Sequence, residues 1–166
     1  MKTPLKGEAI MERVTDAELA AWRAFIKAHA RIIEQIELDL DAQKRVPLTT
    51  YDVLIALFEA PGKKLRFKEL TSKIILTKSG ITRLVDRLEK EGLIVREKDE
   101  LDRRGLYAVL TPAGESELRK AWPVYARGIK QYFAAALTEE EVATIRASME
   151  NIRRGIDERP SDGAEK

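Results

Sequence analysis

The chain has 166 residues, of which 44% are hydrophobic and 35% are charged, and its formal net charge is +2. It contains no cysteine, which excludes disulfide scaffolds, cysteine-based zinc sites and thiol redox switches. No apolar run approaches the roughly 18 residues that a membrane helix needs, and the first residues lack the pattern of a signal peptide. We therefore expect a cytoplasmic protein without a membrane partner.

Positive charge is concentrated in the middle of the chain. Residues 63–104 carry 13 Lys or Arg against 8 Asp or Glu, whereas residues 134–166 carry 5 against 8. A local excess of this kind is typical of a surface that binds phosphates, so the central region is the candidate for nucleic-acid binding.

The first predicted helix runs from about Thr15 to Asp41. Thr15 and Glu18 have the spacing of a capping box. Apolar and aromatic residues then recur at intervals of three and four, and they are Leu19, Trp22, Ile26, His29, Ile33, Ile36 and Leu40. A helix of this length in a small protein usually packs against another long helix, often one from a second subunit.

Two shorter helices follow. The second begins after Pro47 with a threonine cap at Thr49 and ends at Pro61-Gly62, because proline and glycine interrupt helices. A short extended piece covers residues 63–66, and a third helix covers about residues 67–74.

The fourth predicted helix begins after Thr77, its expected N-cap by residue type, and ends at Glu91-Gly92. Its apolar face consists of Ile81, Leu84, Val85 and Leu88, and its opposite face consists of Lys78, Ser79, Thr82 and Arg83. This is the layout of a helix that packs its back on a domain while its front enters the major groove of DNA.

A β-hairpin and two more helices complete the chain. Strands are predicted over residues 93–97 and 106–110, with a turn over residues 98–104. Thr111 and Pro112 have the pattern of a capped start for the fifth helix, in which Pro123 should cause a local kink. Thr138 and Glu141 form a second capping box, which opens a sixth helix with Val142, Ile145, Met149 and Ile152 facing inward.

These elements predict a mainly α fold with a small β-wing, that is, a winged helix-turn-helix flanked by N- and C-terminal helices that form a dimerisation domain. The expected parts are an N-terminal dimerisation helix (12–47), a winged helix-turn-helix DNA-binding domain (48–111), C-terminal dimerisation helices (112–156) and a disordered tail (157–166).

The chain resembles the MarR family of bacterial transcriptional regulators over about residues 15 to 155. Four segments carry the resemblance: Leu48-Thr49 at the start of the second helix, residues 77–94, the wing segment 99–104, and Leu110-Thr111-Pro112-Ala113-Gly114. Glu100-Leu101 departs from the family, in which proline or a small polar pair is frequent there. The resemblance implies a homodimer that binds a pseudo-palindromic double-stranded DNA operator, acts as a repressor, and is released by a small aromatic or phenolic effector.

Four residues of the fourth helix are predicted to contact DNA bases or backbone. Arginine presents a fork that fits the O6 and N7 atoms of guanine, so Arg83 is a candidate for base recognition together with Lys78. Ser79 and Thr82 share that face and allow the backbone to approach. The plainer interpretation, a solvated helix face, is less favoured because the hydroxyl residues lie beside the cations.

Further cations are candidates for phosphate or groove contacts. Thr77 and Arg87 complete the predicted contacts of the helix-turn-helix, and Lys63, Lys64, Arg66 and Lys73 are equally compatible with phosphate contact and with ordinary surface charge. Arg103 and Arg104 at the hairpin tip are suited to a narrow minor groove, which attracts arginine. Asp102 and Asp86 are expected to orient these side chains, although simple solvated charge explains the two acids equally well.

The remaining candidates concern ligands and chemistry. Trp22, His29 and Tyr51 are weak candidates for lining an effector cleft, because aromatic residues on such stripes are more often core. His29 is the only histidine, so a metal site is not expected. We find no catalytic motif and expect neither an enzyme nor a cofactor. The alternative function is a winged-helix protein–protein interaction module without specific DNA binding.

Overall fold

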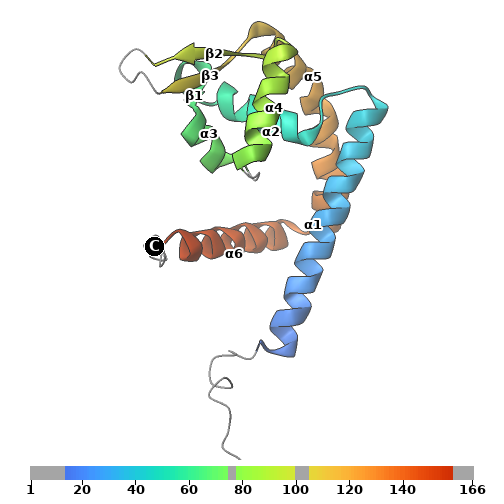
Figure 1. Cartoon of the computed structure of the whole chain (residues 1–166). Helices are drawn as coiled ribbons and strands as arrows, with labels where there is room; N and C mark the ends of the chain where they lie inside the picture. The colour runs from blue at the N-terminus through green and yellow to red at the C-terminus, as the bar shows by residue number, and fades with distance from the viewer. Residues whose placement is uncertain (1–13, 75–77, 100–104, 159–166) are drawn as a thin grey trace, which may run out of the picture.

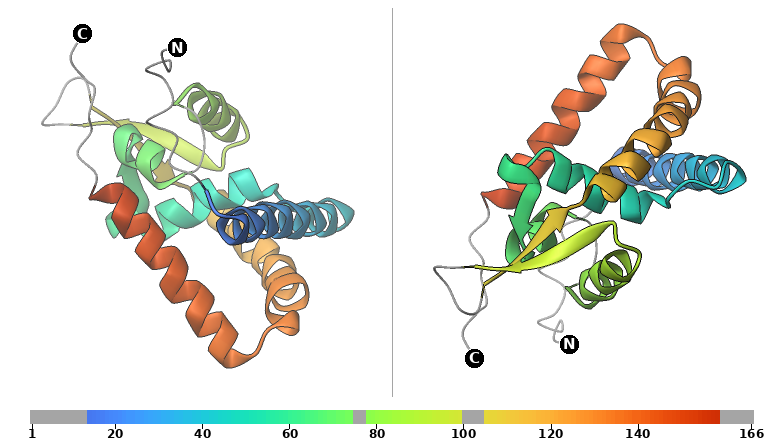
Figure 2. Two further views of the ribbon diagram at one scale, coloured as in Figure 1. Left: turned by 90° about the horizontal axis from the view of Figure 1, so that it is seen from below. Right: turned by 90° about the horizontal axis from the view of Figure 1, so that it is seen from above.

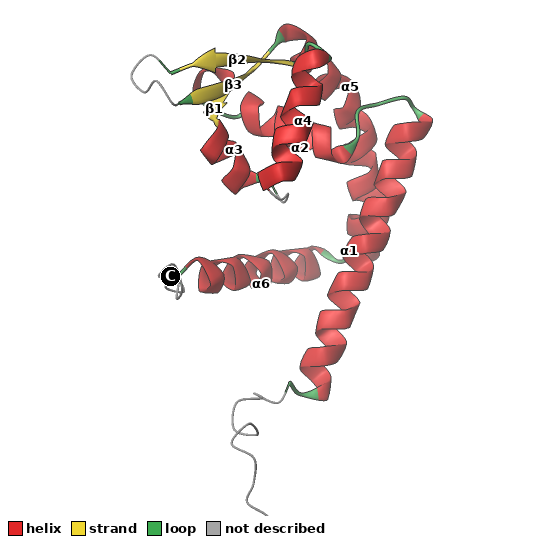
Figure 3. Ribbon diagram, in the orientation of Figure 1, coloured by secondary structure: helices red, strands yellow, loops and turns green. Residues whose placement is uncertain are grey.

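A computed structural model describes residues 14–74, 78–99 and 105–158. In these residues the chain is mostly helical, and its strands gather at one end (Figures 1 and 3). The helices are α1 (Asp16–Ala42), α2 (Leu48–Phe58), α3 (Phe67–Lys73), α4 (Lys78–Lys90), α5 (Pro112–Gly128) and α6 (Glu139–Asp157). The strands are β1 (Lys64–Arg66), β2 (Ile94–Lys98) and β3 (Leu106–Leu110). Short helical turns at Pro61–Lys63 (η1), Ile129–Phe133 (η2) and Ala134–Ala136 (η3) join them.

The fold class predicted from the sequence is confirmed. Three antiparallel strands in the order β1-β3-β2 pack beside α2, α3 and α4 as a winged helix-turn-helix. Ala108 in the central strand is fully buried and is paired with both Leu65 and Arg96. The strand register therefore turns Leu65, Ile94 and Leu110 toward the helices, where all three are buried.

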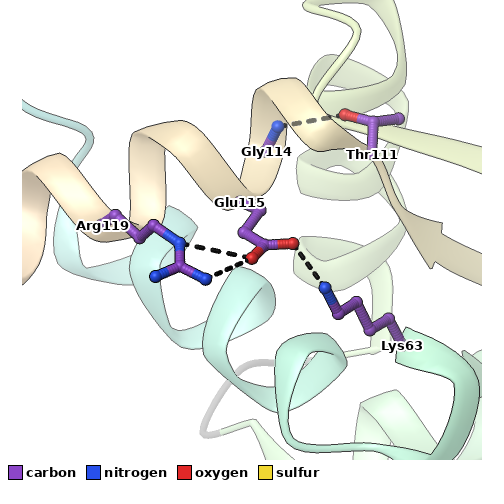
Figure 4. A network of polar contacts seen from close by, with 5 residues as sticks. All are labelled: Lys63, Thr111, Gly114, Glu115 and Arg119. Atoms are coloured by element: carbon purple, nitrogen blue, oxygen red, sulfur yellow. Dashed lines mark hydrogen bonds and ion pairs between the residues drawn. The ribbon is translucent and has the colours of Figure 1, made fainter.

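The start of α5 is fixed to the sheet and to η1 by polar contacts (Figure 4). The Thr111 hydroxyl accepts a hydrogen bond from the Gly114 amide at 3.0 Å, as the predicted cap requires. Glu115, one turn into the helix, lies 2.5 Å from the Lys63 ammonium and 2.6 Å from the Arg119 guanidinium. These contacts join the end of the winged unit to the helix that leads out of it.

The long helices α1 and α5 pack closely at one crossing point. A Cβ atom on Gly128 would lie 2.7 Å from Ile36 Cγ1, so the absence of a side chain lets the helices approach. Nearby, the Tyr132 hydroxyl donates a hydrogen bond to Asp39 at 2.9 Å. Only the C-terminal half of α1 takes part in this packing, since its buried residues are Ile36 and Leu40.

The N-terminal half of α1 and the whole of α6 are exposed in the single chain, and for α6 this differs from the prediction. Residues 20–31 are all exposed, including Trp22 with 60% of its surface accessible. In α6 no residue is buried, and Ile152, which was predicted to face inward, is 56% exposed. Figure 2 shows α6 running across the direction of α1, away from the long helices. Apolar periodicity predicts which face is to be covered but not whether the same chain covers it.

One local prediction was wrong. Thr49 does not cap α2, because the helix already begins at Leu48 and the Glu37 carboxylate accepts a hydrogen bond from the Leu48 amide at 3.1 Å. In α5 the buried residues are Gly114, Leu118, Ala121, Val124 and Gly128, whereas Trp122 is 52% exposed. The α-helix runs through Pro123 and changes to a π-helical turn at η2.

Candidate DNA-binding surface

The two faces of α4 have opposite character in the structure. Ile81, Leu84, Val85 and Leu88 are buried against the rest of the winged unit. Thr82 and Arg83 are exposed on the opposite side, and Lys78 and Ser79 lie in the first turn of the same helix. The helix therefore presents polar residues while its apolar residues hold it to the domain, which is the arrangement of a major-groove recognition helix.

Arg83 lies at a shallow hollow between α4 and the start of α2. The hollow has a volume of about 260 Å³, and its lining includes Thr49, Arg83 and Arg87. Arg87 Nη2 donates a hydrogen bond to the Thr50 hydroxyl at 3.1 Å, and Arg87 Nε lies 3.7 Å from Glu91 Oε1. Two guanidinium groups beside a helix N-terminus give this hollow the chemistry of a phosphate contact.

The base of the wing is held by an ion pair that the sequence did not predict. Arg66 in β1 pairs with Asp99, which directly follows β2 and is 8% exposed. Arg66 Nε also donates a hydrogen bond to the Tyr107 hydroxyl at 3.2 Å. Arg66, a candidate for phosphate contact in the sequence, is thus engaged within the protein. It connects β1 to the residue after β2 and to Tyr107 in β3.

A second ion-pair cluster joins the wing to α4. Arg96 in β2 pairs with Asp86, and its Nη1 atom lies 2.9 Å from Glu89 Oε2. Asp86 was predicted to orient an arginine, and among the described residues its partner is Arg96. Arg96 was not among the residues predicted from the sequence. Its position ten residues after Asp86, in an expected strand beside an expected helix, was the available signal.

Some residues that were predicted to contact DNA, or to orient a residue that does, have no described position. Thr77, Asp102, Arg103 and Arg104 lie outside the described residues, so their roles stay predictions.

A separate cavity of about 570 Å³ lies between α2 and α5. Tyr51, Phe58, Trp122 and Arg119 are among the residues that line it. Burial, with smaller contributions from Tyr125 and two nearby carboxylates, raises the pKa of Tyr51 to about 12. Tyr51 therefore stays neutral at physiological pH. Trp22 and His29, the other two candidates for an effector site, do not line this cavity.

Within residues 14–74, 78–99 and 105–158, no group of three His, Cys, Asp or Glu side chains is arranged to hold a metal ion. None of the helices in those ranges combines the length and the apolarity needed to cross a membrane.

Known proteins are similar to this chain in both sequence and architecture. A family model described as the MarR family matches residues 46–105. An HTH-type transcriptional regulator of Bacillus cereus is 36% identical over 107 residues, which cover 63% of this chain and 69% of the relative. The chain belongs to the MarR family of transcriptional regulators. The resemblance seen in the sequence is confirmed, and the relatives of this MarR-family protein are regulators of transcription rather than enzymes.

Two other proteins similar to this MarR-family chain are a repressor and a regulator crystallised with DNA. The transcriptional repressor MprA of Escherichia coli is 28% identical over 124 residues, covering 75% of this chain and 70% of MprA. The MarR-family regulator Sco3205 of Streptomyces coelicolor, whose crystal structure is in complex with DNA, is 29% identical, with a TM-score of 0.83. That match covers 94% of this chain and 97% of Sco3205.

Proposed function

We propose that this chain is a homodimeric repressor that binds a pseudo-palindromic operator through α4 and the wing. The observation that carries the proposal is the exposure of Thr82 and Arg83 opposite the buried apolar face of α4. Arginine beside small hydroxyl residues is suited to base edges in the major groove, with the remaining cations suited to phosphates. Similarity to a regulator crystallised with DNA and to the repressor MprA supports the same assignment.

The homodimer is supported by apolar surface that the single chain leaves exposed. Trp22 and Phe25 in α1 have 60% and 44% of their surface accessible, and Ile152 and Ile156 in α6 have 56% and 62%. Exposed apolar patches of this kind usually mark a protein interface. A twofold-symmetric partner covers identical patches with identical patches, and it sets two α4 helices on successive major grooves.

Release by a small aromatic or phenolic effector is the third part of the proposal. The cavity between α2 and α5 supports it, because its aromatic walls, with one cation (Arg119) and one carboxylate (Glu59), suit a flat ring that carries polar groups. The Tyr51 ring packs edge-on against Tyr125 at 4.8 Å, so a bound ring would join an existing aromatic cluster.

A titration of the purified protein with the duplex upstream of its own gene tests the proposal. We expect one shifted complex of two chains per duplex, with affinity at least a thousandfold above that for random DNA of the same length. Affinity should fall steeply as salt rises, because bound phosphates release counterions. Equal binding of the two duplexes would indicate a nonspecific binder. No binding of either would favour a protein-interaction module.

A further inference from the structure

The Arg96 side chain, which belongs to β2, contacts two helices of the winged unit. From β2 it pairs with Asp86 and Glu89, both in α4, using a different terminal nitrogen for each carboxylate. Its guanidinium carbon lies 5.3 Å from the centroid of the Phe67 ring in α3. The Arg96 side chain is 27% exposed, less than either carboxylate that it binds. One residue of the wing therefore bridges both helices of the helix-turn-helix.

The geometry of this contact restricts the rotation of α4. Asp86 and Glu89 are three positions apart, so their side chains lie one above the other on the same side of the helix. A planar guanidinium that holds both carboxylates fixes the turn of α4 about its axis as well as its distance from β2. A lysine, which presents a single charged point, would fix the distance alone.

The same contacts make Arg96 a poor phosphate ligand. Both terminal nitrogens face carboxylates, and two negative charges compensate its single positive charge. Its Nε atom is buried and makes no hydrogen bond to any described residue.

We propose that Arg96 is a positioning residue for DNA reading, which holds the polar face of α4 at a fixed angle to the wing so that both enter their grooves together. This inference rests on the proposed function and adds to it a residue that does not contact DNA. Loss of the ion pairs from Arg96 to Asp86 and Glu89 lets α4 rotate relative to β2. Base contacts, which need exact alignment, are lost, whereas phosphate contacts adapt.

The first test is Arg96→Gln, measured on two duplexes at several salt concentrations. One duplex is enriched from a random pool by the wild-type protein, and the other is a scrambled duplex of the same length and composition. We expect the ratio of the two affinities to fall at least tenfold while the slope of affinity against salt is unchanged. Arg96→Lys should recover part of the ratio, since it keeps one of the two ion pairs.

Asp86→Asn with Glu89→Gln gives a sharper test. This double variant keeps Arg96 but removes two negative charges from the recognition helix. Electrostatics alone would then tighten binding to every duplex. The positioning role predicts instead that the affinity for the selected duplex falls toward that for the scrambled duplex. The scrambled duplex should bind the variant as well as it binds the wild-type protein, or better. Because it does not alter β2, this variant also serves if Arg96→Gln fails to fold.

Lys120→Gln is the matched control. Lys120 forms an ion pair with Glu117 at 2.8 Å within α5 and, among the residues that the structure describes, joins no second element, so its loss should leave the affinity ratio unchanged. A salt slope reduced by about one, with equal losses on both duplexes, would make Arg96 a phosphate contact and overturn the proposal. An unchanged affinity ratio in both Arg96→Gln and the double variant of Asp86 and Glu89 would overturn the proposal while leaving the proposed function intact. A wild-type protein that enriches no duplex would contradict both.

Discussion

Gly114 packs directly against the backbone of Leu93. A Cβ atom at position 114 would lie 2.2 Å from the Leu93 carbonyl oxygen and 2.8 Å from Leu110 Cδ1. The Thr111 hydroxyl donates a hydrogen bond to that same carbonyl at 2.9 Å, and the Thr111 amide donates another at 3.2 Å. The backbone at Leu93, just before β2, and the start of α5 are thus held together at the Leu93 carbonyl group.

Gly114→Ala should therefore destabilise the protein strongly. The new methyl group meets backbone, which cannot move aside as a flexible side chain can, and overpacking of this kind costs about 3 kcal/mol. At fixed protein concentration, thermal unfolding should occur roughly 6–12 °C lower. Gly155→Ala is the control, because nothing lies within 4 Å of a Cβ there. An unfolding temperature for Gly114→Ala equal to that of the control would contradict this packing.

Arg83→Ala should weaken operator binding selectively. A bidentate arginine–guanine contact is worth roughly 1–3 kcal/mol of discrimination, which corresponds to roughly a 5- to 150-fold loss of operator affinity. Random DNA should lose little. Fluorescence anisotropy titrations with both duplexes measure the two affinities, and Lys120→Ala controls for the loss of one positive charge. A loss of the same size on both duplexes would mean that Arg83 contacts phosphate only.

Ile152→Glu should dissociate the homodimer. Ile152 is 56% exposed in the single chain and lies among the apolar residues of α6. A carboxylate buried there without a partner would oppose association. Sedimentation velocity should show a monomer whose winged unit keeps its helical circular dichroism. Asn151→Glu adds the same charge one position earlier, on an exposed residue, and should stay dimeric. A dimeric Ile152→Glu protein would place the interface elsewhere.

Tyr51→Phe should change how stability responds to alkaline pH. The pKa of Tyr51 is raised by burial to about 12 in the folded chain, against about 10 in an unfolded one. The proton is held more tightly in the folded state, so this stabilisation is complete below about pH 10 and is lost as pH rises toward 12. Urea unfolding at pH 9 and pH 11.5 should show a smaller decrease in the free energy of unfolding for the variant. An identical decrease in both proteins would contradict the role of Tyr51.

Local signals in the sequence were sufficient for much of the fold. The capping boxes at Thr15 and Thr138 involve residues three positions apart, and both are present. The apolar face of α4 was predicted from periodicity, and all four of its residues are buried. These features depend on neighbours within one helical turn, which a sequence displays directly.

Contacts between distant elements were not predictable in the same way. Glu37 replaces the expected threonine cap of α2 from eleven residues away, and Arg66 meets Asp99 across 33 residues. Each pairing depends on how elements cross, which a single sequence does not encode locally. The exposed stripe on α1 shows a related limit, because the same pattern serves a partner within the chain or in a second chain.

The most direct test of the central claim, that paired α4 helices read base edges, is selection from a random-sequence duplex pool with the purified protein. We predict an enriched inverted repeat whose half-site centres lie about 10 base pairs apart, the separation of successive major grooves. Enrichment of no sequence, or of a single half-site bound by a monomer, would contradict the account.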